Sequence, residues 1–257
     1  MNELAKRDLK ACVSSILVVV LAGSLCSMHA QRAAWRSKPF EQWSKFDVEQ
    51  VLNDSAWVAK QEVRIKQLQE VVSVAGSPGA ALAVGGISPA TDLVFKLRLR
   101  SGLPIRAALL REKQLEANYD QLGERERSEF DAKWGGILQC PACAENYVLT
   151  LSSSSREEPG ADAVYTFLKG AKLTDLQRYV YIANEHGERR PLVHFVPPRA
   201  PGHEAIFYFA RYNDEGTTLF SAKSKELLFN LTNVEVSMVV NFRIDVSRLL
   251  IDDQVSF

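Results

Sequence analysis

Short apolar segments separated by turn residues fill the C-terminal half of the 257-residue chain, and they constrain its fold more than any other feature. They occupy residues 147–151, 178–183, 192–196, 205–212, 226–231 and 234–244. Segments of this length and spacing are typical of β-sandwiches and barrels. Because most connections between them are too short for a helical crossover, we expect sequential antiparallel pairing. The sequence therefore predicts a mainly β (α+β) fold, an antiparallel β-sandwich or open barrel.

The cleanest strand pattern lies earlier, in residues 92–100. Its two faces carry Leu93, Phe95, Leu97 and Leu99 on one side and Lys96, Arg98 and Arg100 on the other. Such alternation predicts a half-buried strand. Another strand is expected over 57–68. Near the C-terminus, Thr232 and Asn233 are expected to form the turn of the last hairpin, and residues 249–257 an edge strand.

An N-terminal arm, residues 31–57, is expected to end in a helix. Ser44 and Asp47 match a capping box before an apolar stripe. Trp43 and Trp57 flank this helix. They are expected to anchor it on the main body rather than to bind a ligand, since large aromatic side chains mostly supply buried area.

The rest of the chain, residues 58–257, is predicted to form a single β-rich domain with two insertions. The segment 72–91 contains four glycines and two prolines but no charge, which predicts a flexible insertion. A helical insertion is expected at about 103–136, where Pro104 starts one helix and the charged residues 124–134 form another. The N-terminal half should therefore hold two or three helices.

Residues 1–30 have the composition of a signal peptide. A basic start precedes an apolar run, 11–25, that is short for a membrane-spanning helix. Cleavage is expected after Ala30 or after Cys26, with a retained N-terminal anchor as the remaining alternative. No later stretch is long and apolar enough to span a membrane. The protein is therefore predicted to be exported, to the periplasm or the extracellular space.

The charge of the chain is balanced overall but not locally. It carries 31 basic and 31 acidic side chains, which argues against a partner held by bulk electrostatics, such as nucleic acid. Residues 96–113, however, contain six basic side chains and one acid. Within them, Lys96, Arg98 and Arg100 share one strand face. This face predicts either an anion-facing surface or a solvated surface paired with acids elsewhere.

The sharpest local motif is Cys140-Pro141-Ala142-Cys143. In an exported protein such a pair is either a local disulfide or a centre for thiol–disulfide exchange. An exchange centre of the thioredoxin type is followed by a long helix, whose N-terminus stabilises the first thiolate. Because a predicted strand follows Cys143 almost at once, a structural disulfide is favoured.

No other motif indicates catalysis, a metal or a cofactor. His186, His194 and His203 lack the spacing of zinc ligands. The serine-rich segment 152–155 has no nucleophile elbow around it, and the glycines of 72–91 lack the pattern of a phosphate-binding loop. We therefore predict no catalytic residues, no metal site and no cofactor.

Several segments resemble a group of exported bacterial proteins that have no assigned activity and are found especially in acidobacteria. These segments are 38–44, the Leu-x-Asp-Ser-x-Trp element at 52–57, 101–109, 147–151 and the hairpin 226–244. The resemblance implies an exported protein with a β-rich body. It implies no activity.

Taken together, these patterns predict a non-enzymatic binding or structural module of the periplasm or cell surface. Its expected partner is an envelope component or another exported protein. The alternative is a periplasmic thiol–disulfide oxidoreductase that uses Cys140 and Cys143.

Overall fold

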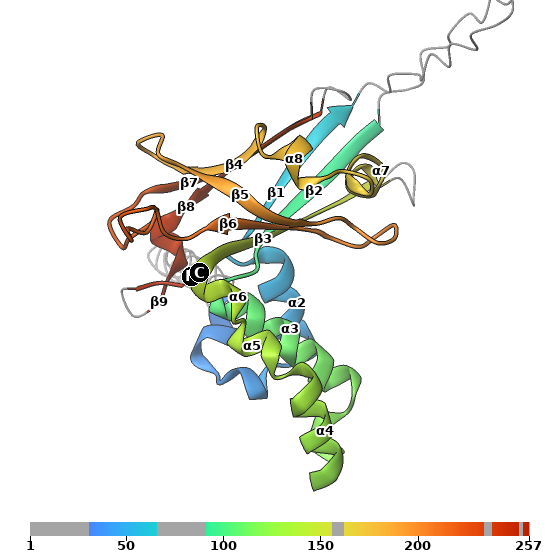
Figure 1. Ribbon diagram of the computed structural model, residues 1–257. Helices are drawn as coiled ribbons and strands as arrows, with labels where there is room; N and C mark the ends of the chain where they lie inside the picture. The colour runs from blue at the N-terminus through green and yellow to red at the C-terminus, as the bar shows by residue number, and fades with distance from the viewer. Residues whose placement is uncertain (1–30, 66–90, 156–161, 234–237, 252–253, 257) are drawn as a thin grey trace, which may run out of the picture.

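The computed structural model describes most of the chain after the predicted leader (Figure 1). The described residues are 31–65, 91–155, 162–233, 238–251 and 254–256. The predicted signal peptide, 1–30, lies outside them, as does most of the predicted flexible insertion, 72–90. Thr91, expected to end that insertion, instead begins a strand.

Eight antiparallel strands form one sheet that nearly closes into a barrel (Figure 1). They are β1 (Val58–Ile65), β2 (Thr91–Leu99), β3 (Asn146–Ser155), β4 (Val180–Asn184), β5 (Arg189–Val196), β6 (Ala205–Ala210), β7 (Glu226–Asn233) and β8 (Met238–Asp245). Their order across the sheet is β1-β2-β3-β6-β5-β4-β7-β8, and the two outermost strands, β1 and β8, lie beside each other. The predicted mainly β fold, an open antiparallel barrel, is confirmed.

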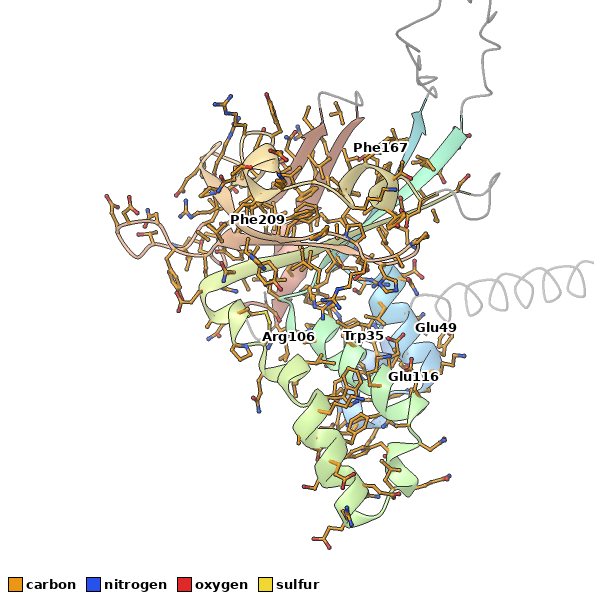
Figure 2. All side chains as sticks on the ribbon, turned by 45° about the vertical axis from the view of Figure 1, so that its right-hand side comes forward. Trp35, Glu49, Arg106, Glu116, Phe167 and Phe209 are labelled. Atoms are coloured by element: carbon orange, nitrogen blue, oxygen red, sulfur yellow. A yellow bond between two sulfur atoms is a disulfide. The ribbon has the colours of Figure 1, made fainter. Side chains whose placement is uncertain are left out.

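Alternating apolar side chains fill the interior of this barrel. On β2 the four predicted apolar residues are buried, whereas Lys96 and Arg98 are only partly buried on the opposite face. Aromatic rings from β6 and β7 meet inside, and the ring centroids of Phe207 and Phe229 lie 5.6 Å apart. Phe209 lies within the same core (Figure 2). The period of two in the sequence therefore identified the buried face correctly.

Two predictions near the C-terminus are wrong. Thr232 and Asn233 do not form the last turn, because both still pair with β8 as the end of β7. Residues 234–237, which connect the two strands, lie outside the described part of the chain. The closing segment is not an edge strand of the main sheet. It forms a separate two-stranded sheet of β9 (Leu250–Ile251) and β10 (Gln254–Val255).

The three predicted helices are present and lie together beneath one end of the barrel, with the third farthest from it (Figure 1). They are α2 (Lys45–Asp54), α3 (Leu103–Glu116) and α4 (Glu124–Trp134). Four short helices were not predicted: α5 (Gly136–Gln139), α6 (Ala142–Glu145), α7 (Ala163–Leu168) and α8 (Leu173–Leu176). The predicted helices of the N-terminal half are therefore present, and the structure adds short helices after them. Segments this short do not establish a helical period in the sequence.

Tryptophans fix the helical end of the molecule to the barrel, as predicted. The ring centroid of Trp35 lies 5.5 Å from that of Trp43 and 6.2 Å from that of Trp57. The indole Nε1 of Trp43 donates to the Trp35 carbonyl at 2.9 Å, and that of Trp57 donates to the Ser256 carbonyl at 2.7 Å. The indole N–H groups of Trp43 and Trp57 therefore have partners within the protein, and all three rings supply buried area.

The predicted capping box of α2 is formed, and it makes the stability of the protein depend on pH. Asp47 accepts hydrogen bonds from the backbone N–H and the hydroxyl of Ser44, at 2.9 and 2.7 Å, and pairs with Lys38 at 3.1 Å. Burial raises the pKa of Asp47, but the Ser44 hydrogen bonds and Lys38 outweigh it and hold the pKa below its usual 3.8. The ionised carboxylate therefore stabilises the folded state.

Replacing Asp47 by asparagine is expected to lower the free energy of unfolding by about 1–2 kcal/mol at neutral pH. Because the pKa of Asp47 is depressed on folding, its contribution is complete above the unfolded pKa and is lost as pH falls through the folded pKa. In urea unfolding, the difference in free energy of unfolding between the wild type and Asp47→Asn should shrink as the pH is lowered. A difference that stays constant with pH would contradict this role.

Candidate functional site

The predicted basic face of β2 makes contacts within the protein. Arg98 donates from Nε to the Leu52 carbonyl at 2.8 Å and from Nη1 to Glu204 at 2.6 Å. Lys96 donates to the side chain of Asn53 at 3.1 Å. Because the last carbonyls of a helix lack partners within it, these contacts hold the end of α2 on the sheet.

The third basic residue of this face is placed differently. Arg100 lies in the turn after β2, is partly exposed, and its side chain makes no hydrogen bond or ion pair with any described residue. Burial lowers the pKa of Lys96, and the charge of Arg98 lowers it further. An anion-facing surface formed by Lys96, Arg98 and Arg100 stays a prediction. Arg98 itself fits the alternative of pairing with an acid elsewhere.

A matched pair of substitutions tests the role of this face. Arg98→Met keeps the aliphatic stem but removes the bonds to Leu52 and Glu204, and we expect it to lower the free energy of unfolding by about 2–3 kcal/mol. Arg100→Met should change it by less than about 0.5 kcal/mol. The measurement is urea unfolding. Equal, small effects of both substitutions would contradict the anchoring role of Arg98.

The two cysteines of the sequence motif are joined. Cys140 and Cys143 form a disulfide with a Cα–Cα distance of 5.3 Å, so the predicted local disulfide is present. The one-turn helix α6 begins within the motif, contains Cys143 and gives way directly to β3, so no long helix continues from the motif. Cys140 has a left-handed backbone, with φ of 42°, and is partly buried, whereas Cys143 is buried. Both cysteines line a cavity.

This cavity has a volume of about 750 Å³ and a basic wall. Its lining residues come from the start of α3, from α5 and α6, from the end of β6 and from the C-terminal segment: Ser101, Leu103, Arg106, Gln139, Cys140, Pro141, Cys143, Ala144, Arg211, Tyr212, Ile251, Gln254, Val255 and Ser256. Two of these are arginines and none is an acid. A cavity of this size falls within the range of small-molecule sites.

Backbone carbonyls hold the first arginine in place. Arg106 donates from Nε to the Ser101 carbonyl at 3.1 Å and from Nη1 to the carbonyls of Leu138 and Gln139. Its Nη2 makes no hydrogen bond with any described residue. Figure 2 shows Arg106 where the helices meet the barrel. One edge of the guanidinium is therefore fixed by backbone carbonyls.

The second arginine, Arg211, follows β6 and is held by its backbone and by an aromatic ring. Its N–H donates to the Glu145 carbonyl at 2.9 Å, and its guanidinium lies over the ring of Tyr147 at 4.6 Å from the centroid. A cation is attracted to the face of an aromatic ring. The Nε of Arg211 is buried, and none of its side-chain nitrogens bonds to a described residue.

The two guanidiniums affect each other electrostatically. Burial lowers the pKa of Arg106, and the positive charge of Arg211 lowers it further. Neither arginine forms an ion pair within the described residues. Two partly buried cations that no described acid pairs with repel each other, and an anion placed between them would relieve that repulsion.

The sequence did not reveal this pair. Arg106 belongs to the basic segment 96–113, but nothing in the sequence distinguishes it from its neighbours there, and no motif surrounds Arg211. The two residues meet only because α3 and the end of β6 border the same cavity. Of the predicted site residues, the cysteine pair lies here, and Lys96, Arg98 and Arg100 do not line the cavity.

The described ranges hold neither a metal-ligand cluster nor a membrane-spanning helix. In these ranges, no three histidine, cysteine, aspartate or glutamate side chains gather where they could hold a metal ion. No helix among them has the length and apolar character to cross a membrane. The ring of His194 packs against Tyr208, with 5.0 Å between centroids, and His186 is exposed beside Glu185.

Comparison with known proteins adds no family. No protein-family model matches the chain, and neither a curated protein nor a solved structure is significantly similar to it.

Proposed function

We propose that the protein is an exported, non-enzymatic binding module that takes a small anionic ligand between Arg106 and Arg211. One observation carries the proposal: two positioned guanidiniums face a cavity of about 750 Å³ that no described acid lines. Arginine presents several N–H donors in a planar array that suits carboxylate and phosphate oxygens. Export and the lack of enzymatic activity are part of the proposal, supported by the leader-like residues 1–30 and by the absence of a catalytic motif in the sequence.

Thermal unfolding of the full chain with added anions tests this proposal. Inorganic phosphate and butyrate, each compared with sodium chloride at equal ionic strength, should raise the melting temperature of the wild type in a saturable way. Arg211→Gln should abolish this rise. Arg125→Gln, at a side chain that is 92% exposed on α4, is the matched control and should retain it.

A second readout separates a ligand-binding arginine from a structural one. Without ligand, Arg211→Gln should change the free energy of unfolding by less than about 1 kcal/mol, because lost stacking on Tyr147 is offset by relief of repulsion with Arg106. The proposal fails if neither anion stabilises the wild type beyond the chloride control. It also fails if Arg211→Gln responds as the wild type does.

Two acids that are sequence neighbours of cavity-lining residues provide a further test. Asp252 and Asp253 lie outside the described residues, between the lining residues Ile251 and Gln254. The double substitution to asparagine removes any competition from these carboxylates. Phosphate and butyrate should then bind at least as tightly as to the wild type. Weaker binding would mean that the acids belong to the site, which contradicts an anion-selective cavity.

Thiol–disulfide exchange is the second candidate, because both cysteines of the disulfide line the cavity of the two arginines. Nearby cations favour a thiolate at Cys140 or Cys143. In such an exchange one thiolate of a partner dithiol attacks the disulfide, and the second resolves the mixed disulfide. The partner leaves oxidised, and Cys140 and Cys143 leave reduced.

Equilibration with glutathione buffers tests this candidate. Exchange requires that the disulfide has a reduction potential within about −120 to −270 mV. It also requires that the protein oxidises a reduced peptide and that Cys140→Ser loses this activity. A potential below about −300 mV without turnover would leave the disulfide a structural one.

A further inference from the structure

A second hollow adjoins the arginine cavity and is largely apolar. It has a volume of about 610 Å³ and is lined by Trp35, Arg36, Lys38, Phe40, Trp43, Trp57, Leu103, Pro104, Ala107, Leu138, Leu250 and Ile251. The indole N–H groups of Trp43 and Trp57 are bonded within the protein, and both side chains are buried, so their rings form part of the apolar wall behind this hollow. Its two charged residues are both cations, and one of them, Lys38, is paired with Asp47.

The two hollows share their walls. Leu103 and Ile251 line both of them. In α3, Arg106 faces the basic hollow and the next residue, Ala107, lines the apolar one. In α5, Gln139 lines the basic hollow and Leu138 lines the apolar one. A ligand that binds the arginines could therefore extend directly over Leu103 into the apolar hollow.

The junction between the hollows is itself apolar and open to solvent. Leu103 is 45% exposed, one of few large apolar side chains in the described residues with so much accessible surface. An exposed leucine between a cationic hollow and an apolar hollow is a surface that an alkyl chain would cover. The protein therefore has, side by side, a site that suits the anionic head of an amphiphile and a site that suits its apolar tail.

We propose that the ligand is a single-chain monocarboxylate of medium to long chain length. Its carboxylate would accept hydrogen bonds from Arg106 and Arg211, and its alkyl chain would cross Leu103 into the hollow beside Phe40 and Leu138. This inference rests on the proposed function and specifies its ligand. Its occupant is a free amphiphile rather than a membrane, because the second hollow is an open recess between the N-terminal arm, α3 and β9 rather than a flat surface.

Calorimetric titration of the full chain with butyrate, octanoate and decanoate, each below its micelle concentration, tests the proposal. Each added methylene should tighten binding about threefold. Phe40→Ala should reduce the increase in affinity from butyrate to octanoate at least threefold. It should leave the affinity for butyrate unchanged. Phe46→Ala, at a 63% exposed side chain outside both hollows, is the matched control and should keep the full gain.

A second variant guards against misfolding of the first. Leu138→Ala should flatten the chain-length dependence in the same way, since the carbonyl of Leu138 remains available to Arg106. If butyrate binds but octanoate binds no more tightly, the amphiphile is excluded while anion binding stands. If octanol binds as tightly as octanoate and Arg211→Gln has no effect, the proposed function itself fails, and this inference fails with it.

Discussion

Trp57→Ala is expected to lower the free energy of unfolding by about 3–5 kcal/mol, the largest single effect we predict. Trp57 is 0% exposed, and its ring packs against Trp35 and Gly102. It also joins two distant parts of the chain, because its indole donates to the carbonyl of Ser256. Truncation removes this bond and leaves a large cavity between the helices and the barrel.

Urea unfolding measures this effect, and Trp134 supplies the matched control. Trp134 ends α4 and is partly exposed, with Lys133 and Lys113 near its ring. Trp134→Ala should cost about 1 kcal/mol or less. Comparable losses for the two substitutions would show that Trp57 does not link the helices to the barrel.

Gly102→Ala is expected to be nearly as damaging, with a loss of about 3 kcal/mol or more, although it adds a single methyl group. A Cβ atom at Gly102 would lie 2.4 Å from Cδ1 of Trp57 and 3.1 Å from the carbonyl oxygen of Leu99. The Gly102 backbone has φ of −63°, which alanine adopts freely, so the requirement is for space alone. Neither the buried indole nor the strand carbonyl can move away without disturbing the core.

The control for this substitution is Gly136→Ala. A Cβ atom there meets nothing within 4 Å, and Gly136 begins α5. Alanine is the better helix former, so Gly136→Ala should be neutral or should stabilise by up to about 1 kcal/mol. Thermal unfolding distinguishes the two results. A neutral Gly102→Ala would contradict the close approach of α3 to Trp57.

Much of the fold could be predicted because its signals are local. The alternation on β2 and the capping box of Ser44 and Asp47 depend on residues a few positions apart, and both were identified correctly. The failures have the same origin. Helices α7 and α8 span too few residues to show a period. The last hairpin keeps pairing through Thr232 and Asn233, although asparagine is typical of turns.

The candidate site could be predicted only in part. Cys140 and Cys143 stand close in the sequence, so their disulfide was foreseeable. Arg106 and Arg211 come from α3 and from the end of β6, and only the folded chain brings them to one cavity. Likewise, the sequence predicted the basic face of β2, but it did not predict the ion pair between Arg98 and Glu204. Tertiary contacts, which no local pattern encodes, decide which cations pair with an acid in the described part of the chain.

The central claim, that Arg106 and Arg211 bind one anion between them, is tested most directly at the guanidiniums. Nitrogen–proton NMR spectra show the Nε–H signals of arginine side chains, and the two signals are assigned by their loss in Arg106→Gln and Arg211→Gln. On titration with octanoate, both signals should shift together and saturate with one dissociation constant, while that of Arg125 stays in place. If the Arg106 and Arg211 signals do not move, or drift without saturation as that of Arg125 does, the cavity is not the binding site and the account is wrong.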